Sequence, residues 1–92
     1  MAERINSISE NPVAVDWAPT SEVYVQADFT GPERPVQVEI SARADAAANW
    51  EPIGRIKRGD QPPIARFPKY PLIQVKVTGN TGGATVKVWS GE

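Results

Sequence analysis

Carboxylates are the side chains that could carry acid–base chemistry in this chain, because its 92 residues include neither histidine nor cysteine. Asp28 and Glu39 fall on the polar faces of two candidate strands, where they could pair as acid and base. Carboxylates at such positions are ordinarily solvated, outward-facing residues. No serine lies in a nucleophile elbow, and Gly79, Gly82 and Gly83 lack the Lys-Ser/Thr pair and following helix of a phosphate-binding loop. The sequence therefore predicts a protein that is not an enzyme and holds no cofactor.

A metal site has little support in the sequence. Glu33, Asp45 and Asp60 fall in different predicted loops, so a calcium site is conceivable. However, no Asp-x-Asp-x-Asp-Gly spacing concentrates oxygen ligands in one loop. Without cysteine or histidine there is no thiolate or imidazole zinc site. We therefore expect no metal to be required for folding.

One basic cluster stands out. It consists of Arg55, Lys57, Arg58, Arg66 and Lys69. Phe67 and Tyr70 lie nearby, and a mixture of cations and aromatic rings can bind single-stranded nucleic acid. The net charge of −1 argues against a dedicated nucleic-acid binder, whose domain is usually strongly basic. Two interpretations remain, a solvated loop and a surface that docks on an acidic protein.

Charge is unevenly divided along the chain. Residues 1–51 carry three basic and nine acidic residues, a net −6, whereas residues 52–92 carry seven basic and two acidic residues, a net +5. If strands from the two halves interleave, these charges cancel in space. Otherwise the molecule has an acidic and a basic pole, which favours head-to-tail contacts between copies.

The large aromatic side chains divide by their position in the alternation. Trp17 falls on the apolar parity of its strand, and Trp50 begins a strand after a loop, so both are predicted to lie in the core. Trp89 shares a parity with Thr85 and Lys87 and should point outward. Tyr24 points outward by the same argument. Such a tryptophan is either covered by the N-terminal residues or used in an interface.

Period-two alternation of apolar and polar residues dominates the chain and predicts strands with one buried face. It covers residues 23–29, 36–42, 73–77 and 84–88, with a shorter run at 13–17 and a less regular one at 50–57. Residues 1–11 have no such pattern and are predicted to be a flexible N-terminal arm. Residues 12–92 are predicted to form a single small antiparallel β-sandwich of six or seven strands, with a small Greek-key barrel as the alternative. The expected core consists of Val23, Val25, Phe29, Val36, Val38, Ile40, Trp50, Ile53, Ile73, Val75, Val77, Val86 and Val88.

The connections carry turn residues. Residues 72–90 contain two clean strands joined by the glycine-rich stretch 79–83, which predicts a β-hairpin. Residues 58–71 are rich in proline and should form an extended connection between the sheets. Residues 45–49 are long enough for a turn or two of helix.

The absence of cysteine favours a protein made in a reducing cytoplasm, because a small extracellular domain is usually stapled by disulfides. No apolar run approaches the length of a transmembrane helix, and the N-terminus lacks the features of a signal peptide. We therefore expect a soluble chain with no membrane contact. A domain of this size buries only about 60–65% of its unfolded surface, so oligomerisation would be an economical source of further burial.

Three stretches carry a family resemblance: Asn49-Trp50-Glu51-Pro52-Ile53-Gly54, Tyr70 to Asn80, and Gly83 to Val88. Together they resemble small β-sandwich structural proteins of tailed bacteriophages, in which an NWxxIG stretch follows a strand and a plIxVxVTGNTGGATVxV hairpin closes the domain. The likeness covers residues 36–90. The same motifs are shared in part with carbohydrate-binding and discoidin-like sandwiches.

The resemblance implies a virion component, made in the host bacterial cytoplasm: a capsid decoration or cement protein, or a head-fibre or tail accessory domain. Its expected partners are the major capsid protein or another virion protein, and further copies of itself. The alternative is a carbohydrate- or receptor-binding module that uses Trp89, Tyr24 or Tyr70. In either case the expected partner-binding residues are Tyr24, Arg55, Lys57, Arg58, Arg66, Lys69 and Trp89, and we expect the arm and the basic cluster to carry most of the attachment.

Overall fold

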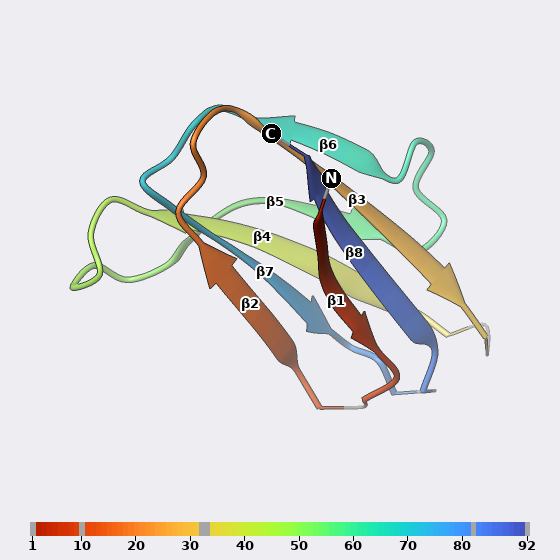
Figure 1. Cartoon of the computed structure of the whole chain (residues 1–92). Helices are drawn as coiled ribbons and strands as arrows, with labels where there is room; N and C mark the ends of the chain where they lie inside the picture. The colour runs from red at the N-terminus through yellow and green to blue at the C-terminus, as the bar shows by residue number, and fades with distance from the viewer. Residues whose placement is uncertain (1, 10, 32–33, 82, 92) are drawn as a thin grey trace.

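The chain is all-β, with no helix among the residues that the structure describes. A computed structural model describes residues 2–9, 11–31, 34–81 and 83–91. Its eight strands are β1 (Ala2–Ser7), β2 (Val13–Trp17), β3 (Val23–Thr30), β4 (Gln37–Arg43), β5 (Glu51–Lys57), β6 (Ile64–Phe67), β7 (Leu72–Thr78) and β8 (Thr85–Gly91) (Figure 1). The predicted all-β class is confirmed, with β1 and β6 added to the six strands predicted from the alternation.

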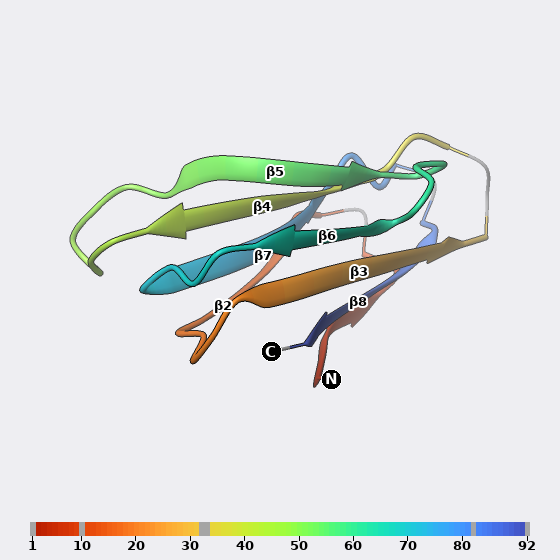
Figure 2. The ribbon, with the colours of Figure 1, turned by 90° about the horizontal axis from the view of Figure 1, so that it is seen from above.

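The strands form two four-stranded antiparallel sheets that stack as a sandwich. Sheet A has the order β1-β8-β3-β6 and sheet B the order β2-β7-β4-β5. Seen from above, β4 and β5 lie in one layer and β3 and β8 in the other (Figure 2). Because successive side chains alternate between the faces of a strand, each strand sends one set of residues into the space between the sheets. The prediction of a sandwich is therefore confirmed over that of a barrel.

The core lies between the two sheets and agrees closely with the predicted set. Ten of its thirteen members are buried, and Phe29 and Ile53 pack against its margin. Trp50 is the exception, because it is only half-buried and its ring stacks with the guanidinium of Arg43 at 4.2 Å. Trp17, also predicted to lie in the core, is half-buried and packs against it.

The predicted hairpin at residues 72–90 is wrong, because β7 lies in sheet B and β8 in sheet A. The connection between them is built around Asn80, which is 3% exposed. Its Nδ2 donates to the carbonyl of Ala84 at 2.9 Å, and its Oδ1 accepts from the amide of Ala84 at 2.9 Å. Gly79 and Gly83 adopt φ of 75° and 68°, a left-handed conformation that favours glycine. These residues turn the chain from one sheet to the other.

The proline-rich connection does pass between the sheets, as predicted, because it joins β5 of sheet B to β6 of sheet A. The short strand β6 pairs with β3 and was not anticipated. Phe67 at its end packs over Gly54 of β5, where an added Cβ would lie 2.9 Å from the ring. Glycine at position 54 therefore allows the two edge strands to approach closely.

The prediction of an unstructured arm at residues 1–11 is wrong for the strand β1. This strand pairs with β8, and its Ile5 is 3% exposed. Arg4 also points inward, where its guanidinium lies 4.1 Å from the ring centroid of Trp17 and its Nε donates to Ser90 Oγ at 2.7 Å. A register shift between Glu3 and Ile5 breaks the period-two pattern, which explains why the sequence showed no strand here. Met1 and Glu10 lie outside the described residues.

The stretch at residues 45–49 forms a turn and no helix: the amide of Ala47 donates to Asp45 Oδ1 at 2.8 Å and that of Ala48 to the carbonyl of Asp45 at 3.0 Å. In the described ranges no helix could span a membrane.

Candidate functional site

The structure separates the seven predicted partner-binding residues into two main groups. Tyr24, Arg66 and Trp89 come together on the outer face of sheet A, on β3, β6 and β8. Arg55 and Lys57 lie instead on the outer side of β5 in sheet B. The remaining two, Arg58 and Lys69, follow the ends of β5 and β6.

The outer face of sheet A is organised in rows across its strands. The middle row runs Glu3, Trp89, Gln26, Ile64, and the next row runs Gly91, Tyr24, Arg66. On the other side of the middle row, Lys87 lies directly opposite Asp28. We call this surface the tryptophan face, defined by Tyr24, Gln26, Asp28, Ile64, Lys87, Trp89 and Gly91.

The tryptophan face exposes apolar side chains. Tyr24 is 40% exposed and Ile64 is 38% exposed, and only Ile8 joins them as an exposed large hydrophobic residue in the described part of the chain. Trp89 is half-buried, with Glu3 of β1 as its neighbour on one side. Tyr24 and Trp89 are diagonal neighbours on adjacent strands, a spacing within reach of two aromatic side chains. Their outward orientation was predicted from parity, and the pairing of β3 with β8 brings them into one patch.

A cation lies at the edge of this patch. A hydrogen bond with the Tyr24 side chain, and next the charge of the Glu22 carboxylate, raise the pKa of Arg66 above its ordinary value. Arg66 Nε and Glu22 Oε2 are 4.0 Å apart, and both side chains are more than half exposed. Because solvent screens such a pair, it contributes little stability. Arg66 is therefore a permanently charged residue at the rim of the tryptophan face.

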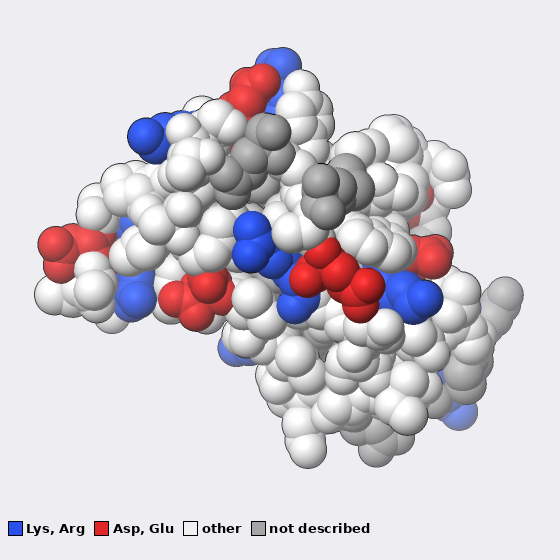
Figure 3. Space-filling model, in the orientation of Figure 1, with Lys and Arg blue, Asp and Glu red and all other residues white. Residues whose placement is uncertain are grey.

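The two oppositely charged halves of the sequence interleave in space. Asp28, from the first half, lies opposite Lys87 from the second. On sheet B, Glu39 lies between Lys76 and Arg55 in the same way. Figure 3, in which sheet A faces the viewer, shows acidic and basic side chains alternating across the middle of that face. The interpretation that the charges cancel in space is therefore the one that fits, and the described residues of this face form neither an acidic nor a basic pole.

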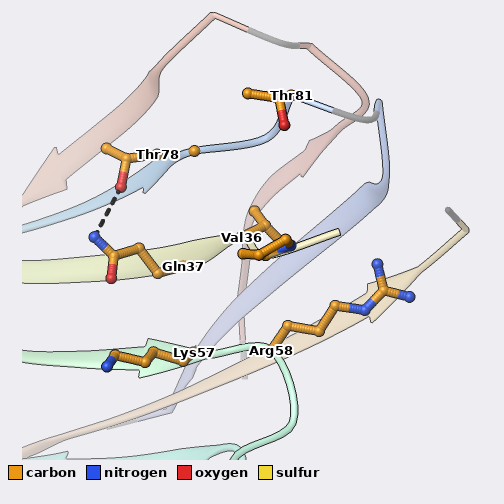
Figure 4. Close-up of a pocket in the computed structure, with 8 residues that line it drawn as sticks. Val36, Gln37, Lys57, Arg58, Thr78 and Thr81 are labelled. Carbon is orange, nitrogen blue, oxygen red and sulfur yellow. Dashed lines mark hydrogen bonds between the residues drawn. The ribbon is translucent and has the colours of Figure 1, made fainter. Parts of the chain in front are cut away.

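The basic cluster does not converge on one site. A hollow of about 460 Å³ at the end of sheet B is lined by Gln37, Lys57, Arg58 and Thr78, among others. Gln37 Nε2 donates to Thr78 Oγ1 at 3.3 Å across it, and Lys57 and Arg58 extend in opposite directions (Figure 4). Arg58 Nη2 donates to the carbonyl of Gly31 at 3.1 Å. The two cations therefore do not aim at a common anion in this hollow.

The carboxylates also fail to form the acid–base pair considered above. Asp28 projects from the outer face of sheet A and Glu39 from the outer face of sheet B, on opposite sides of the sandwich. Among the described residues no three metal-ligating side chains gather, and Glu33 lies outside them.

Sequence reasoning missed Gln26, Ile64 and the Asp28–Lys87 pair as parts of the surface. The outward parity of Gln26 and Asp28 was a usable signal, because it matches that of Tyr24. Ile64 carried no such signal, because its strand has four residues between prolines. Comparison with known proteins adds no further residues: no protein-family model, curated protein or solved structure matches this chain.

Proposed function

We propose that the chain is a non-enzymatic structural protein of a bacteriophage virion, a capsid decoration or cement protein that binds major capsid subunits and its own copies. The tryptophan face is the observation that supports a binding role. The stretches at residues 49–54, 70–80 and 83–88 support the virion assignment by their resemblance to phage β-sandwich proteins. On this proposal the protein is made in the host cytoplasm and resides in the virion.

The composition of the tryptophan face suits protein association. Stable interfaces combine a desolvated centre, often with tryptophan, tyrosine or arginine, with a polar rim that stays wet. Trp89, Tyr24 and Ile64 provide such a centre, while Asp28, Lys87 and Arg66 provide such a rim.

Cosedimentation with empty capsids, assembled from the major capsid protein of the same virus, tests the proposal. Native protein should sediment with the capsids at a saturating stoichiometry. A Tyr24→Ala, Trp89→Ala protein should lose this binding, while Gln74→Ala on the outer face of sheet B should retain it. Native protein that stays in the supernatant at every concentration would overturn the virion assignment.

A carbohydrate- or receptor-binding module is the second candidate, and one observation favours it. Tyr24 and Trp89 lie on a single open face, as a sugar-stacking platform requires. Tyr70, the third ring considered, is half-buried and packs against the core. Titration of the isolated protein with oligosaccharides, followed by tryptophan fluorescence, tests this alternative. A saturable change that Trp89→Ala abolishes would support it.

A further inference from the structure

The tryptophan face carries a pattern that is complementary to itself. Its two central strands, β8 and β3, present three opposed pairs in consecutive rows: Gly91 with Tyr24, Trp89 with Gln26, and Lys87 with Asp28. Each pair joins unlike partners, a glycine with a ring, a ring with an amide and a cation with an anion. A second copy that placed its β3 over β8, and its β8 over β3, would therefore set each of these six residues against the unlike partner that it already has within the sheet.

We propose that two copies of this chain pair face to face through the tryptophan face, about a twofold axis that runs parallel to the strands between β8 and β3. Rotation about this axis keeps each row in place and exchanges the two strands. Lys87 then faces the partner's Asp28, and Asp28 faces the partner's Lys87. Tyr24 lies over the partner's Gly91, where no side chain blocks the ring. Twisted sheets pack in this aligned manner, with strands within about 30° of each other.

The charges select this axis over the other simple twofold arrangements. An axis that crosses the strands at the Lys87–Asp28 row would place lysine over lysine and aspartate over aspartate. An axis that crosses them at the Trp89 row would place Lys87 over the partner's Gly91 and leave Asp28 without a counter-charge. Only the axis parallel to the strands gives two opposite-charge contacts, and such complementarity fixes the register of an interface.

The two charged residues are available for a partner. In the described part of the chain, the side chains of Asp28 and Lys87 make no hydrogen bond or ion pair, although the two residues are neighbours across two strands. The outer face of sheet B differs, because Glu39 Oε1 accepts from Gln37 Nε2 at 3.1 Å and Gln37 also reaches Thr78 at 3.3 Å. The polar groups of sheet A therefore suit an intermolecular contact better than those of sheet B.

This inference names the surface for the self-association part of the proposed function and rests on that part alone. The isolated protein tests it without any capsid. Capsid subunits and a second copy would occupy the same face in turn, so the two assays score different partners. A protein that binds capsids without dimerising overturns this inference alone, and one that dimerises without binding capsids overturns the virion assignment alone.

The experiment uses two charge-reversal variants, Asp28→Lys and Lys87→Asp, with mass measured by light scattering after size exclusion over a range of concentrations. Native protein should approach twice its 10.0 kDa monomer mass as concentration rises. Each variant alone presents like charges to its copy, so its dissociation constant should rise at least roughly tenfold. An equimolar mixture should recover the dimer, because one variant then presents two lysines in this row and the other presents two aspartates.

Matched controls come from sheet B, where Glu39 and Lys76 are also direct neighbours across two strands. Glu39→Lys and Lys76→Glu create the same repulsion within one chain but should dimerise like the native protein. Thermal melts of all four variants report whether each one is folded. The proposal is overturned if the native protein stays monomeric, if the mixture does not recover the dimer, or if the sheet B variants weaken association equally. A native monomer that binds oligosaccharide would point to the carbohydrate-binding alternative.

Discussion

The outer faces of the two sheets share a plan and differ in what they display. Each has an opposite-charge pair across its two central strands, Asp28 with Lys87 on sheet A and Glu39 with Lys76 on sheet B. On sheet A this pair lies next to a row that contains Trp89 and Ile64. On sheet B the corresponding neighbours on the two central strands are polar. They are Gln37 opposite Thr78, and Ser41 opposite Gln74.

The polar groups of the two faces are also used differently. On sheet B, Gln37 links Glu39 and Thr78 by hydrogen bonds of 3.1 and 3.3 Å. On sheet A, the side chains of the charged pair make no such contact within the described residues, and Tyr24 and Ile64 on the same face are exposed. Exposed apolar surface rimmed by charge marks an interaction site, whereas a hydrogen-bonded polar surface is stable in water. On our proposal, sheet A therefore provides the face for a partner and sheet B a face for solvent.

Removing residues 2–9 should have the largest effect on stability, because it deletes strand β1, which pairs with β8 beside Trp89. Full burial of Ile5 contributes about 1.5–3 kcal/mol, and the hydrogen bond from Arg4 to Ser90 contributes about 1.5–3 kcal/mol because its donor is charged. We expect the free energy of unfolding in urea to fall by about 3 kcal/mol or more. Asn6→Ala, on the outer side of the same strand, is the control and should change it by less than about 0.5 kcal/mol. An unchanged denaturation midpoint after the deletion would restore the flexible-arm interpretation.

The next largest effect on stability is expected from a substitution on the inner side of a strand, compared with one on its outer side. Val75 is fully buried between the sheets, whereas its neighbour Lys76 lies on the outer face of sheet B. Val75→Ala should destabilise the domain by about 2–3 kcal/mol. Lys76→Ala should cost less than about 0.5 kcal/mol, because nothing buried is lost. Equal effects in urea denaturation would mean that the face of β7 is assigned wrongly.

The inner faces could be predicted from the sequence because burial imposes a period of two, which survives wherever a strand is regular. The same period does not report which sheet a strand joins. The alternation at residues 73–77 and 84–88 fits two hairpin partners and two strands of opposite sheets equally well. In the structure the strands lie in opposite sheets, and the buried side chain of Asn80 holds the connection between them by two hydrogen bonds to Ala84. Strand β1 was not predicted because a bulge separates Glu3 from Ile5, its one buried apolar residue.

The candidate site was harder to predict than the core, because it depends on which strands are neighbours. Tyr24 and Trp89 could be assigned outward from their parity, but their adjacency follows from the pairing of β3 with β8. Residues 55–58 and 66–69 look like one basic cluster in the sequence. They are divided because the chain changes sheet between β5 and β6, so that Arg55 and Arg66 project from opposite faces of the sandwich.

Replacing Trp89 on sheet A, and an outward residue at a comparable position on sheet B, tests which face carries the dimer contact. Trp89→Ala should raise the dissociation constant of the dimer about tenfold or more, since aromatic residues at the centre of an interface commonly contribute more than about 1 kcal/mol. Gln74→Ala occupies a comparable outward position on a central strand of sheet B and should leave the constant unchanged. Sedimentation equilibrium measures both. An effect of Gln74→Ala equal to that of Trp89→Ala would place the contact elsewhere.

Salt should produce the smallest effect, and it separates the charged rim from the aromatic centre. Raising the ionic strength from about 0.1 M to about 1 M shortens the Debye length from about 10 Å to about 3 Å. The Lys87–Asp28 contacts of the dimer lie beside the apolar centre and remain partly solvated, so the dissociation constant should rise only a few-fold. An Asp28→Asn, Lys87→Gln protein should associate more weakly at low salt and lose this dependence, because it retains the rings and lacks the charges. The matched Glu39→Gln, Lys76→Gln protein should keep the native dependence, because its substitutions lie on the solvent face. If the neutralised sheet A protein still responds to salt like the native one, other charges, such as Glu3 or Arg66 at the rim, carry the electrostatic part of the contact.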